Sequence, residues 1–466
     1  PTRLDEITDL DVEQLIEAGR PGDAAVAGWT LPGLARLHGY GYVVDVAAVR
    51  AADLQCGMGD WRRPSLLHGA AKDALNSCIS GEGEPPLRLT IAAVACAGSG
   101  VICGIPVQQL REDSVTELNL SNRGLHVPAA MLVAYLIPAT SVLKNCNLLK
   151  NRFDVESATM LAKMGAEKGI MLSGMTRDQT EADFSHQNLQ PADAILIASD
   201  LKFMAVLTKL ELFNNSIGDE GAKAIAEALK VNAVLTTLQL YNNKIGAGGA
   251  KAIAEALKVN AVLTTLDLGY NSIGVEGAKA IAEALKVNAV LTELSLSNNN
   301  IGPEGAIAIA EALKVNAVVT TLSLRNNTIG DEGAKAIAEA LKVNAVLTTL
   351  RLDGNRIGAE GAKAIAEALK VNAVLTKLSL WNNNIGNDGA KAIAEALKVN
   401  AVMTTLDLFR NNIGPEGAIA IAEALKVNAV LTKLDIRANN MGDAGGKAVR
   451  DAVKGRSGFV LELYGK

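Results

Sequence analysis

The pattern of apolar and polar positions repeats every 28 residues from Leu207 onward, so that nine units fill residues 207–458. Each unit opens with alternating apolar residues, as in Leu263-Thr-Thr-Leu-Asp-Leu268, and this period of two predicts a short strand. A run such as Gly221-Ala-Lys-Ala-Ile-Ala-Glu-Ala-Leu-Lys230 follows, with its apolar residues on one face of a helix. Neither element can bury its apolar side alone, so neighbouring units must stack.

The spacing also predicts which side chains are displayed. We count positions from the first apolar residue of each unit, so that Leu263 is position 1. Leucines at positions 4 and 6 point inward, and positions 3, 5 and 7 therefore project from the other face of the sheet. In the first helix, Asp219 and Glu220 stand at the start and Lys230 at the end, where the helix dipole favours each charge.

These units resemble the leucine-rich repeat family, and specifically its 28-residue ribonuclease-inhibitor type. The resemblance rests on leucine at positions 1, 4 and 6, asparagine at position 9 and the Ile-Gly pair that follows. It implies an α/β horseshoe solenoid with a parallel sheet on the concave side and helices on the convex side, and it implies no enzyme. It also implies a ladder of buried asparagines that bond the loop backbone between repeats: Asn215, Asn243, Asn271, Asn299, Asn327, Asn355, Asn383, Asn411 and Asn439.

Degenerate copies of the unit extend the array toward the N-terminus. Val115 and Leu143 open two units 28 residues apart, and Gln179 opens a third after 36 residues. The longer gap predicts an eight-residue insertion near residues 170–177. We therefore expect a capping region at 1–114, degenerate repeats at 115–206, regular repeats at 207–458 and a closing strand at 459–466.

Composition limits which residue types can form the core and which class of partner can bind. Hydrophobic residues make up 49% of the chain but aromatic residues only 3%, so the core must be aliphatic. A net charge of −5 without any basic run argues against nucleic acid as a partner. Five cysteines in no metal-binding spacing indicate reduced thiols in an intracellular, reducing compartment. We expect the cytoplasm, with an organelle after removal of a targeting segment as the alternative.

The few aromatic residues of the regular repeats all stand at position 7 or 8, beside the predicted concave face. Exposed aromatic residues and arginines are typical anchors of protein interfaces. We therefore expect a protein partner of unknown identity to bind there, and rank a sugar ligand lower. Two patches are expected, one from Phe213, Tyr241 and Tyr270 and one from Trp381, Phe409 and Arg410. The predicted partner-binding residues are Phe213, Tyr241, Tyr270, Arg325, Arg351, Asp353, Trp381, Phe409, Arg410 and Arg437.

The N-terminal region gives weaker signals. Residues 4–17 suggest an acidic amphipathic helix that caps the array, and residues 21–85 are punctuated by glycine and proline. Residues 89–110 carry no charge and are long enough to span a bilayer, so membrane association is an alternative for this stretch. Their glycines and glutamines favour a buried strand and turn instead. The glycines near Gly98 only superficially resemble a dinucleotide-binding turn, since no second strand has room to follow.

The sequence shows no motif for catalysis. Four scattered histidines lack ligand spacing, and no nucleophile motif, phosphate loop or carboxylate pair is present, so we predict no enzyme activity, metal or cofactor. The predicted function is a non-enzymatic scaffold that binds a protein partner through the concave face. One alternative is a constitutive structural subunit of a large assembly, either with or without membrane association through residues 89–110. The other is a regulator of the GTPase-activating or innate-immune leucine-rich-repeat type.

Overall fold

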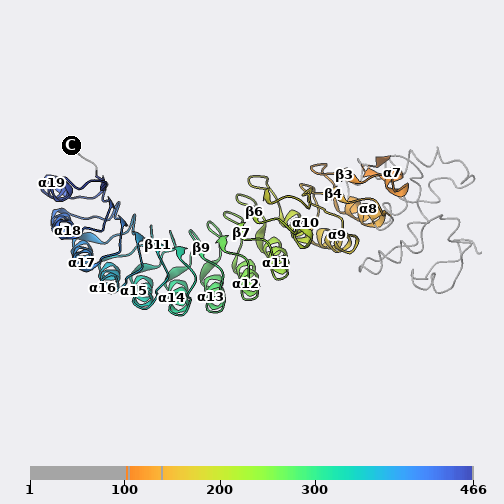
Figure 1. The fold of residues 1–466 in the computed structure, drawn as a ribbon. Helices are drawn as coiled ribbons and strands as arrows, with labels where there is room; N and C mark the ends of the chain where they lie inside the picture. Colours follow the sequence, from red (N-terminus) through yellow and green to blue (C-terminus); the bar gives the residue numbers. More distant parts are fainter. Residues whose placement is uncertain (1–100, 103–104, 138–139, 464–466) are drawn as a thin grey trace, which may run out of the picture. The chain divides into compact units, whose positions relative to one another are not determined.

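A computed structural model describes residues 101–102, 105–137 and 140–463 (Figure 1). The predicted helix at 4–17, the region 21–85 and residues 89–100 of the uncharged stretch lie outside these residues. The chain divides into two compact units, which are described separately. The N-terminal unit comprises Pro1–Arg177 and Leu189–Phe203, and the C-terminal unit comprises Asp178–Asn188 and Met204–Lys466.

The C-terminal unit is built on a parallel sheet whose strand order follows the sequence. From β5 to β14, position 4 of each repeat faces position 4 of the next, as Leu322 faces Leu350, so the register shift equals one repeat. The strands are β5 (Glu181–Asp183), β6 (Lys209–Glu211), β7 (Thr237–Gln239), β8 (Thr265–Asp267), β9 (Glu293–Ser295), β10 (Thr321–Ser323), β11 (Thr349–Arg351), β12 (Lys377–Ser379), β13 (Thr405–Asp407), β14 (Lys433–Asp435) and β15 (Val460–Glu462).

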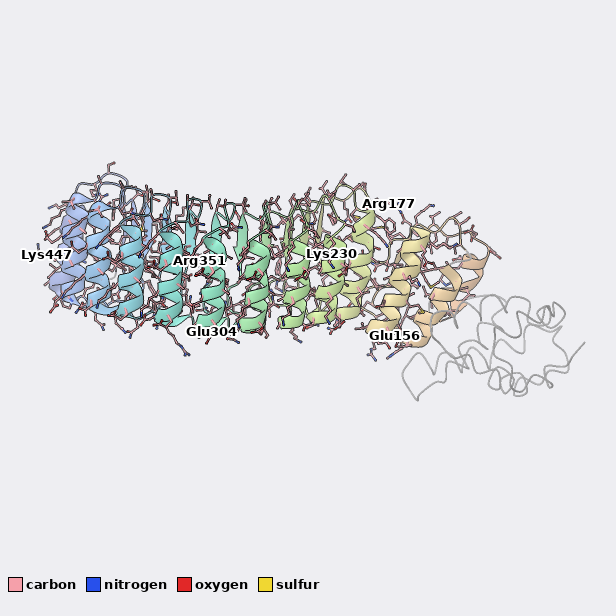
Figure 2. All side chains as sticks on the ribbon, turned by 90° about the horizontal axis from the view of Figure 1, so that it is seen from below. Glu156, Arg177, Lys230, Glu304, Arg351 and Lys447 are labelled. Carbon is pink, nitrogen blue, oxygen red and sulfur yellow. The ribbon has the colours of Figure 1, made fainter. Side chains whose placement is uncertain are left out.

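One helix connects each strand from β6 onward to the next. In Figure 1 these helices lie on the outer side of a curved array and the strands on its inner, concave side, and Figure 2 views the helices side by side. The predicted α/β solenoid is confirmed. The helices are α11 (Gly218–Leu229), α12 (Ala247–Leu257), α13 (Gly274–Leu285), α14 (Gly302–Leu313), α15 (Gly330–Leu341), α16 (Ala359–Leu369), α17 (Gly386–Val399), α18 (Pro415–Val427) and α19 (Gly442–Val453).

The core between sheet and helices is aliphatic, as the composition predicts. In the repeat that begins at Leu263, the inward residues Leu266, Leu268 and Ile273 are at most 1% exposed, and so are Ile281 and Leu285 of α13. Small residues let the helices approach closely. A Cβ added to Gly305 would lie 2.2 Å from the Ile301 side chain and 3.0 Å from Ala278 of the preceding helix, which explains the glycine at this position.

The N-terminal unit contains shorter elements. β1 (Val101–Ile102) and β2 (Ile105–Pro106) pair antiparallel, and β3 (Glu117–Asn119) and β4 (Asn145–Asn147) pair parallel. Its helices are α7 (Val107–Arg111), α8 (Val127–Leu136), α9 (Val155–Lys168), α10 (Pro191–Asp200) and the short 3-10 helix η3 (Leu201–Phe203). Ile105 and Val107 are fully buried within this unit. Among the described residues, no helix is long and apolar enough to cross a membrane.

Residues 170–177, where the sequence predicts an insertion, contribute a strand-like segment to the N-terminal unit. Met171 bridges to Asn145 in parallel, and the Cys146 N–H donates to the Met171 carbonyl at 2.7 Å. The Asp200 carboxylate accepts from the Leu172 and Ser173 N–H groups at 2.9 and 2.8 Å. Burial raises the pKa of Asp200 to about 6, and burial, followed by the charge of Asp200, raises the pKa of the Cys146 thiol to about 12.

Candidate binding face of the parallel sheet

Asparagine side chains at position 9 hold the loops that follow the strands. The Asn271 Nδ2 donates to the Leu240 carbonyl of the preceding repeat at 3.0 Å, and its Oδ1 accepts from the N–H groups of Asn243 and Ile245, both at 2.9 Å. Eight of the nine asparagines predicted for this ladder are at most 8% exposed, and Asn439 is half-buried. Buried hydrogen bonds from the neighbouring repeat therefore fix the backbone on both sides of positions 7 and 8.

A second asparagine ladder, which we did not predict, holds the opposite end of each repeat. The Asn260 Nδ2 donates to the Leu229 carbonyl at 2.7 Å, and its Oδ1 accepts from the Val262 and Leu263 N–H groups at 3.0 and 2.8 Å. A 28-residue recurrence of asparagine in Val-Asn-Ala-Val is the signal that could have revealed it. Its members are 5–7% exposed: Asn232, Asn260, Asn288, Asn316, Asn344, Asn372, Asn400 and Asn428.

The backbone turns sharply at position 8 of every regular repeat, where φ is positive. Asparagine or glycine occupies most of these positions, because both residues tolerate the left-handed region. Tyr270 and Arg410 adopt the same conformation at φ values of 54° and 53°. Bulky side chains are uncommon there, and such a conformation costs on the order of 1 kcal/mol. Both residues are exposed and stand at the edge of the concave face.

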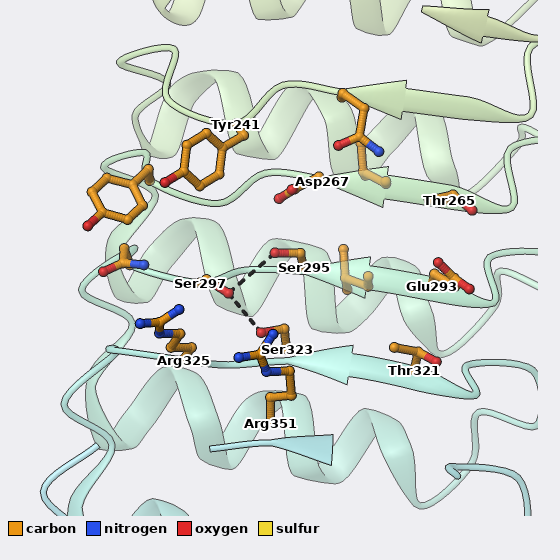
Figure 3. Close-up of a pocket in the computed structure, with 15 residues that line it drawn as sticks. Tyr241, Thr265, Asp267, Glu293, Ser295, Ser297, Thr321, Ser323, Arg325 and Arg351 are labelled. Carbon is orange, nitrogen blue, oxygen red and sulfur yellow. Dashed lines mark hydrogen bonds between the residues drawn. The ribbon is translucent and has the colours of Figure 1, made fainter. Parts of the chain in front are cut away.

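The first aromatic cluster joins Tyr241 and Tyr270, whose ring centroids lie 5.1 Å apart. Beside them the sheet surface holds a cavity of about 370 Å³ (Figure 3). Burial raises the pKa of Tyr241 above its usual value, so its hydroxyl stays protonated at neutral pH. Burial also raises the pKa of the Asp267 carboxyl, which lines the same cavity.

Hydroxyl and guanidinium groups line part of this cavity, together with the side chains of Gln239, Glu293 and Asn298. The Ser297 hydroxyl bonds those of Ser295 and Ser323 at 3.3 and 2.8 Å, and Figure 3 shows this chain between Tyr241 and the two arginines, Arg325 and Arg351. The predicted patch that joined Phe213 to the two tyrosines is arranged differently. Phe213 packs edge-on against His186 at 5.1 Å, a histidine to which the sequence analysis gave no role.

The second aromatic cluster joins Trp381 and Phe409, with ring centroids 5.9 Å apart. The guanidinium of Arg325 lies over the Trp381 ring at 4.5 Å, and that of Arg437 over the Phe409 ring at 5.5 Å. The Arg325 Nε and the Trp381 Nε1 are buried and have no hydrogen-bond acceptor among the described residues. Two donors of this cluster are therefore left unsatisfied within the described chain.

Asp353 requires a correction, because it is only 1% exposed and cannot act as a displayed anchor. Its carboxylate accepts from the Arg351 Nε at 3.1 Å and from the Ser379 hydroxyl. Arg325 and Trp381, at position 7 of the repeats on either side, meet above this position. Asp353 therefore holds Arg351 as a buried partner, and alternation alone could not distinguish this arrangement from an exposed carboxylate.

A second cavity of about 330 Å³ lies over β11–β14, where charged residues alternate. Arg437 pairs with Asp435 at 2.5 Å and with Glu462 of β15 at 2.6 Å, and Lys433 pairs with Glu462 at 2.9 Å. Burial raises the pKa of Asp407, and the neighbouring carboxylates Asp435 and Asp353 add to this shift. Ion pairs among Lys433, Arg437, Asp435 and Glu462 therefore form one side of this cavity, and the Asp407 carboxyl lies among other carboxylates.

Comparison with known proteins identifies the repeat. A family model described as "Leucine Rich repeat" matches nine consecutive segments, at residues 204–226, 231–254, 259–282, 287–310, 315–338, 343–366, 371–394, 399–422 and 427–449. The chain is a leucine-rich repeat protein. The 28-residue spacing of these matches confirms the predicted ribonuclease-inhibitor type of repeat. Leucine-rich repeats of this kind are in general protein-interaction scaffolds without catalytic activity.

Individual relatives add little to this assignment. No curated protein matches the chain. Among solved structures, 156 chains match it. One of them, titled "Leiomodin-1 Actin-Binding Site 2 (ABS2)", is 32% identical, with a TM-score of 0.28, over 32% of this chain and 86% of that chain. At this TM-score the likeness carries no argument about this leucine-rich repeat protein.

The chemistry of the leucine-rich repeat surface is that of binding. Within the described ranges, no group of three or more His, Cys, Asp or Glu side chains is arranged to hold a metal ion. What the concave face does offer is rings, hydroxyl groups and guanidinium groups fixed on a hydrogen-bonded sheet. These groups can contact a partner's apolar side chains and its oxygen acceptors at the same time.

Proposed function

We propose that this leucine-rich repeat protein binds a protein partner on the concave sheet of its C-terminal unit, through the two aromatic clusters. The observation that carries the proposal is the pair of buried, unsatisfied donors at the second cluster, the Arg325 Nε and the Trp381 Nε1. A buried donor without an acceptor costs about 1–3 kcal/mol, and a partner that supplies an acceptor would recover that energy.

Preorganisation supports the same proposal. Strand backbones, position 9 asparagines and ring contacts hold the anchors before a partner arrives, which lowers the ordering cost of binding. The two clusters present different chemical groups. The first adjoins a cavity whose lining includes hydroxyl groups, and in the second guanidinium groups stack on aromatic rings. A partner that fits both offers apolar or aromatic side chains together with carbonyl or carboxylate oxygens.

We also propose the domain limits expected from the sequence. Degenerate repeats at 115–206 precede regular repeats at 207–458, and residues 459–466 close the array. The spacing of β3, β4, β5 and β6 supports this division, because it is 28, 36 and 28 residues in turn.

Affinity purification with mass spectrometry tests the binding proposal. The full chain is compared with a variant in which Tyr241, Trp381 and Arg410 are replaced by alanine. A matched control replaces three helix-face glutamates of the same repeats, Glu255, Glu395 and Glu423, which are 56–60% exposed. We expect the first variant to lose a major partner that the control retains, with unchanged circular dichroism. Equal retention by both variants would contradict the proposal.

A further inference from the structure

One rim of the C-terminal unit is apolar along eight successive repeats. The link from each helix to the next strand reads Val-Asn-Ala-Val, in which the asparagine is buried, the alanine is exposed and the second valine is half-exposed. The first valine is 62–71% exposed in every repeat. We call this row the valine rim: Val231, Val259, Val287, Val315, Val343, Val371, Val399 and Val427.

The rim is continuous because neighbouring links are bonded to one another. Asn260 reaches from its own link to the Asn232 carbonyl at 3.3 Å, and the same contact recurs along the second asparagine ladder. Summed over the row, eight valines exposed to this extent present on the order of 800 Å², which is comparable to the surface that each partner buries in a stable interface.

The charges beside the rim are neutralised within the chain. A lysine precedes each valine, and its Nζ pairs with the glutamate three residues earlier, as Lys286 pairs with Glu283 at 2.6 Å. All eight such pairs have this distance. Another surface of the same kind can therefore approach the rim without facing a row of uncompensated positive charge.

We propose that the valine rim is a dimer interface whose occupant is a second copy of this chain. The rim repeats one small side chain at a fixed spacing, and a second copy presents the same spacing. A twofold axis between Val315 and Val343 would lay the two curved arrays rim to rim with matching curvature. This symmetry sets Val231 against the partner's Val427 and Val315 against the partner's Val343, whereas a slip by one repeat leaves end valines uncovered.

Sedimentation of the full chain over a micromolar concentration range tests the interface. The wild-type chain is expected to sediment at twice the mass of a single chain. Serine at four central positions should raise the dissociation constant at least tenfold: Val287, Val315, Val343 and Val371. The control Ile307→Ser with Ile419→Ser changes two helix residues that are 39% and 42% exposed, and it should leave the dimer intact. A monomeric wild-type chain, or a serine variant that dimerises like the wild type, overturns the proposal.

Cysteine cross-linking tests the register separately and does not depend on weakening the interface. Chains carrying Val231→Cys mixed with chains carrying Val427→Cys should form a disulfide-linked dimer under mild oxidation. A mixture of Val231→Cys and Val259→Cys chains should not exceed the wild-type background, which includes the five native cysteines. Cross-linking that is equal in the two mixtures overturns the twofold arrangement.

Discussion

Replacing one ladder asparagine in the middle of the array tests whether the repeats are held together as the structure indicates. Asn327 is fully buried, and its Nδ2 donates to the Leu296 and Leu324 carbonyls at 2.8 and 3.0 Å. Its Oδ1 accepts from the N–H groups of Asn299 and Ile301 at 2.9 and 3.3 Å. Alanine would leave two buried N–H groups without this acceptor. At about 1–3 kcal/mol each, the expected loss of unfolding free energy is about 2–6 kcal/mol.

Urea unfolding followed by circular dichroism measures this loss. In a solenoid, stability is the sum of repeat terms and nearest-neighbour interfaces, so a break in the middle should also separate the transition into two steps. Asn439→Ala, at the half-buried end of the ladder, should fray only the last repeat and lower the midpoint less. The matched control is Asn300→Gly, because Asn300 is an exposed asparagine with a φ of 52° that glycine adopts freely.

The control should change the unfolding free energy by less than about 0.5 kcal/mol. If Asn327→Ala and Asn300→Gly lower the stability equally, the buried amide does not hold the repeats together. If Asn327→Ala costs several kcal/mol but unfolding stays a single step, the nearest-neighbour description is wrong for this array.

Three further predictions concern single positions. Asp331→Ala removes the acceptor for the Gly358 and Gly361 N–H groups at 2.7 and 2.9 Å, and should cost about 1 kcal/mol in urea unfolding, whereas Asp331→Asn should not. The pKa of Asp200, raised to about 6, means that the folded state binds the proton more tightly than the unfolded state. Relative to Asp200→Asn, the wild-type chain should therefore gain up to about 3 kcal/mol of stability as pH falls from 7 to 4 in thermal melts. Tyr270→Asn should raise stability by about 1 kcal/mol in urea unfolding while it weakens partner capture, and a loss of stability would contradict the strain argument.

The fold could be predicted from the sequence because every repeat must meet the same packing requirements. Each helix must bury residues such as Ile281 against the strands, and each must leave room for its neighbour at positions such as Gly305. Any change to this pattern would have to be accommodated by both adjacent repeats. The apolar spacing therefore survives in near-identical copies, and it is readable without an alignment.

The site could be predicted only in part, because exposure at position 7 depends on residues one repeat away. Alternation placed Asp353 on the displayed side, but neighbouring side chains cover it and Ser379 bonds it. Phe213 packs against His186, which belongs to the preceding, degenerate repeat. Such contacts connect residues 26 to 28 positions apart, and a pattern read within one repeat cannot include them.

Position 8 gives the clearest argument that the residues at the concave edge did not arise by random substitution of a solvated surface. Asparagine and glycine are the residues that the left-handed turn accepts, and a change to tyrosine or arginine lowers stability without improving the core. Of the two departures with large side chains, Tyr270 contacts the Tyr241 ring of the preceding repeat, and Arg410 directly follows Phe409 in the chain. Random drift on a solvated turn would favour small polar residues. Large side chains that keep a strained backbone on the same face as unsatisfied donors are instead expected where a partner binds.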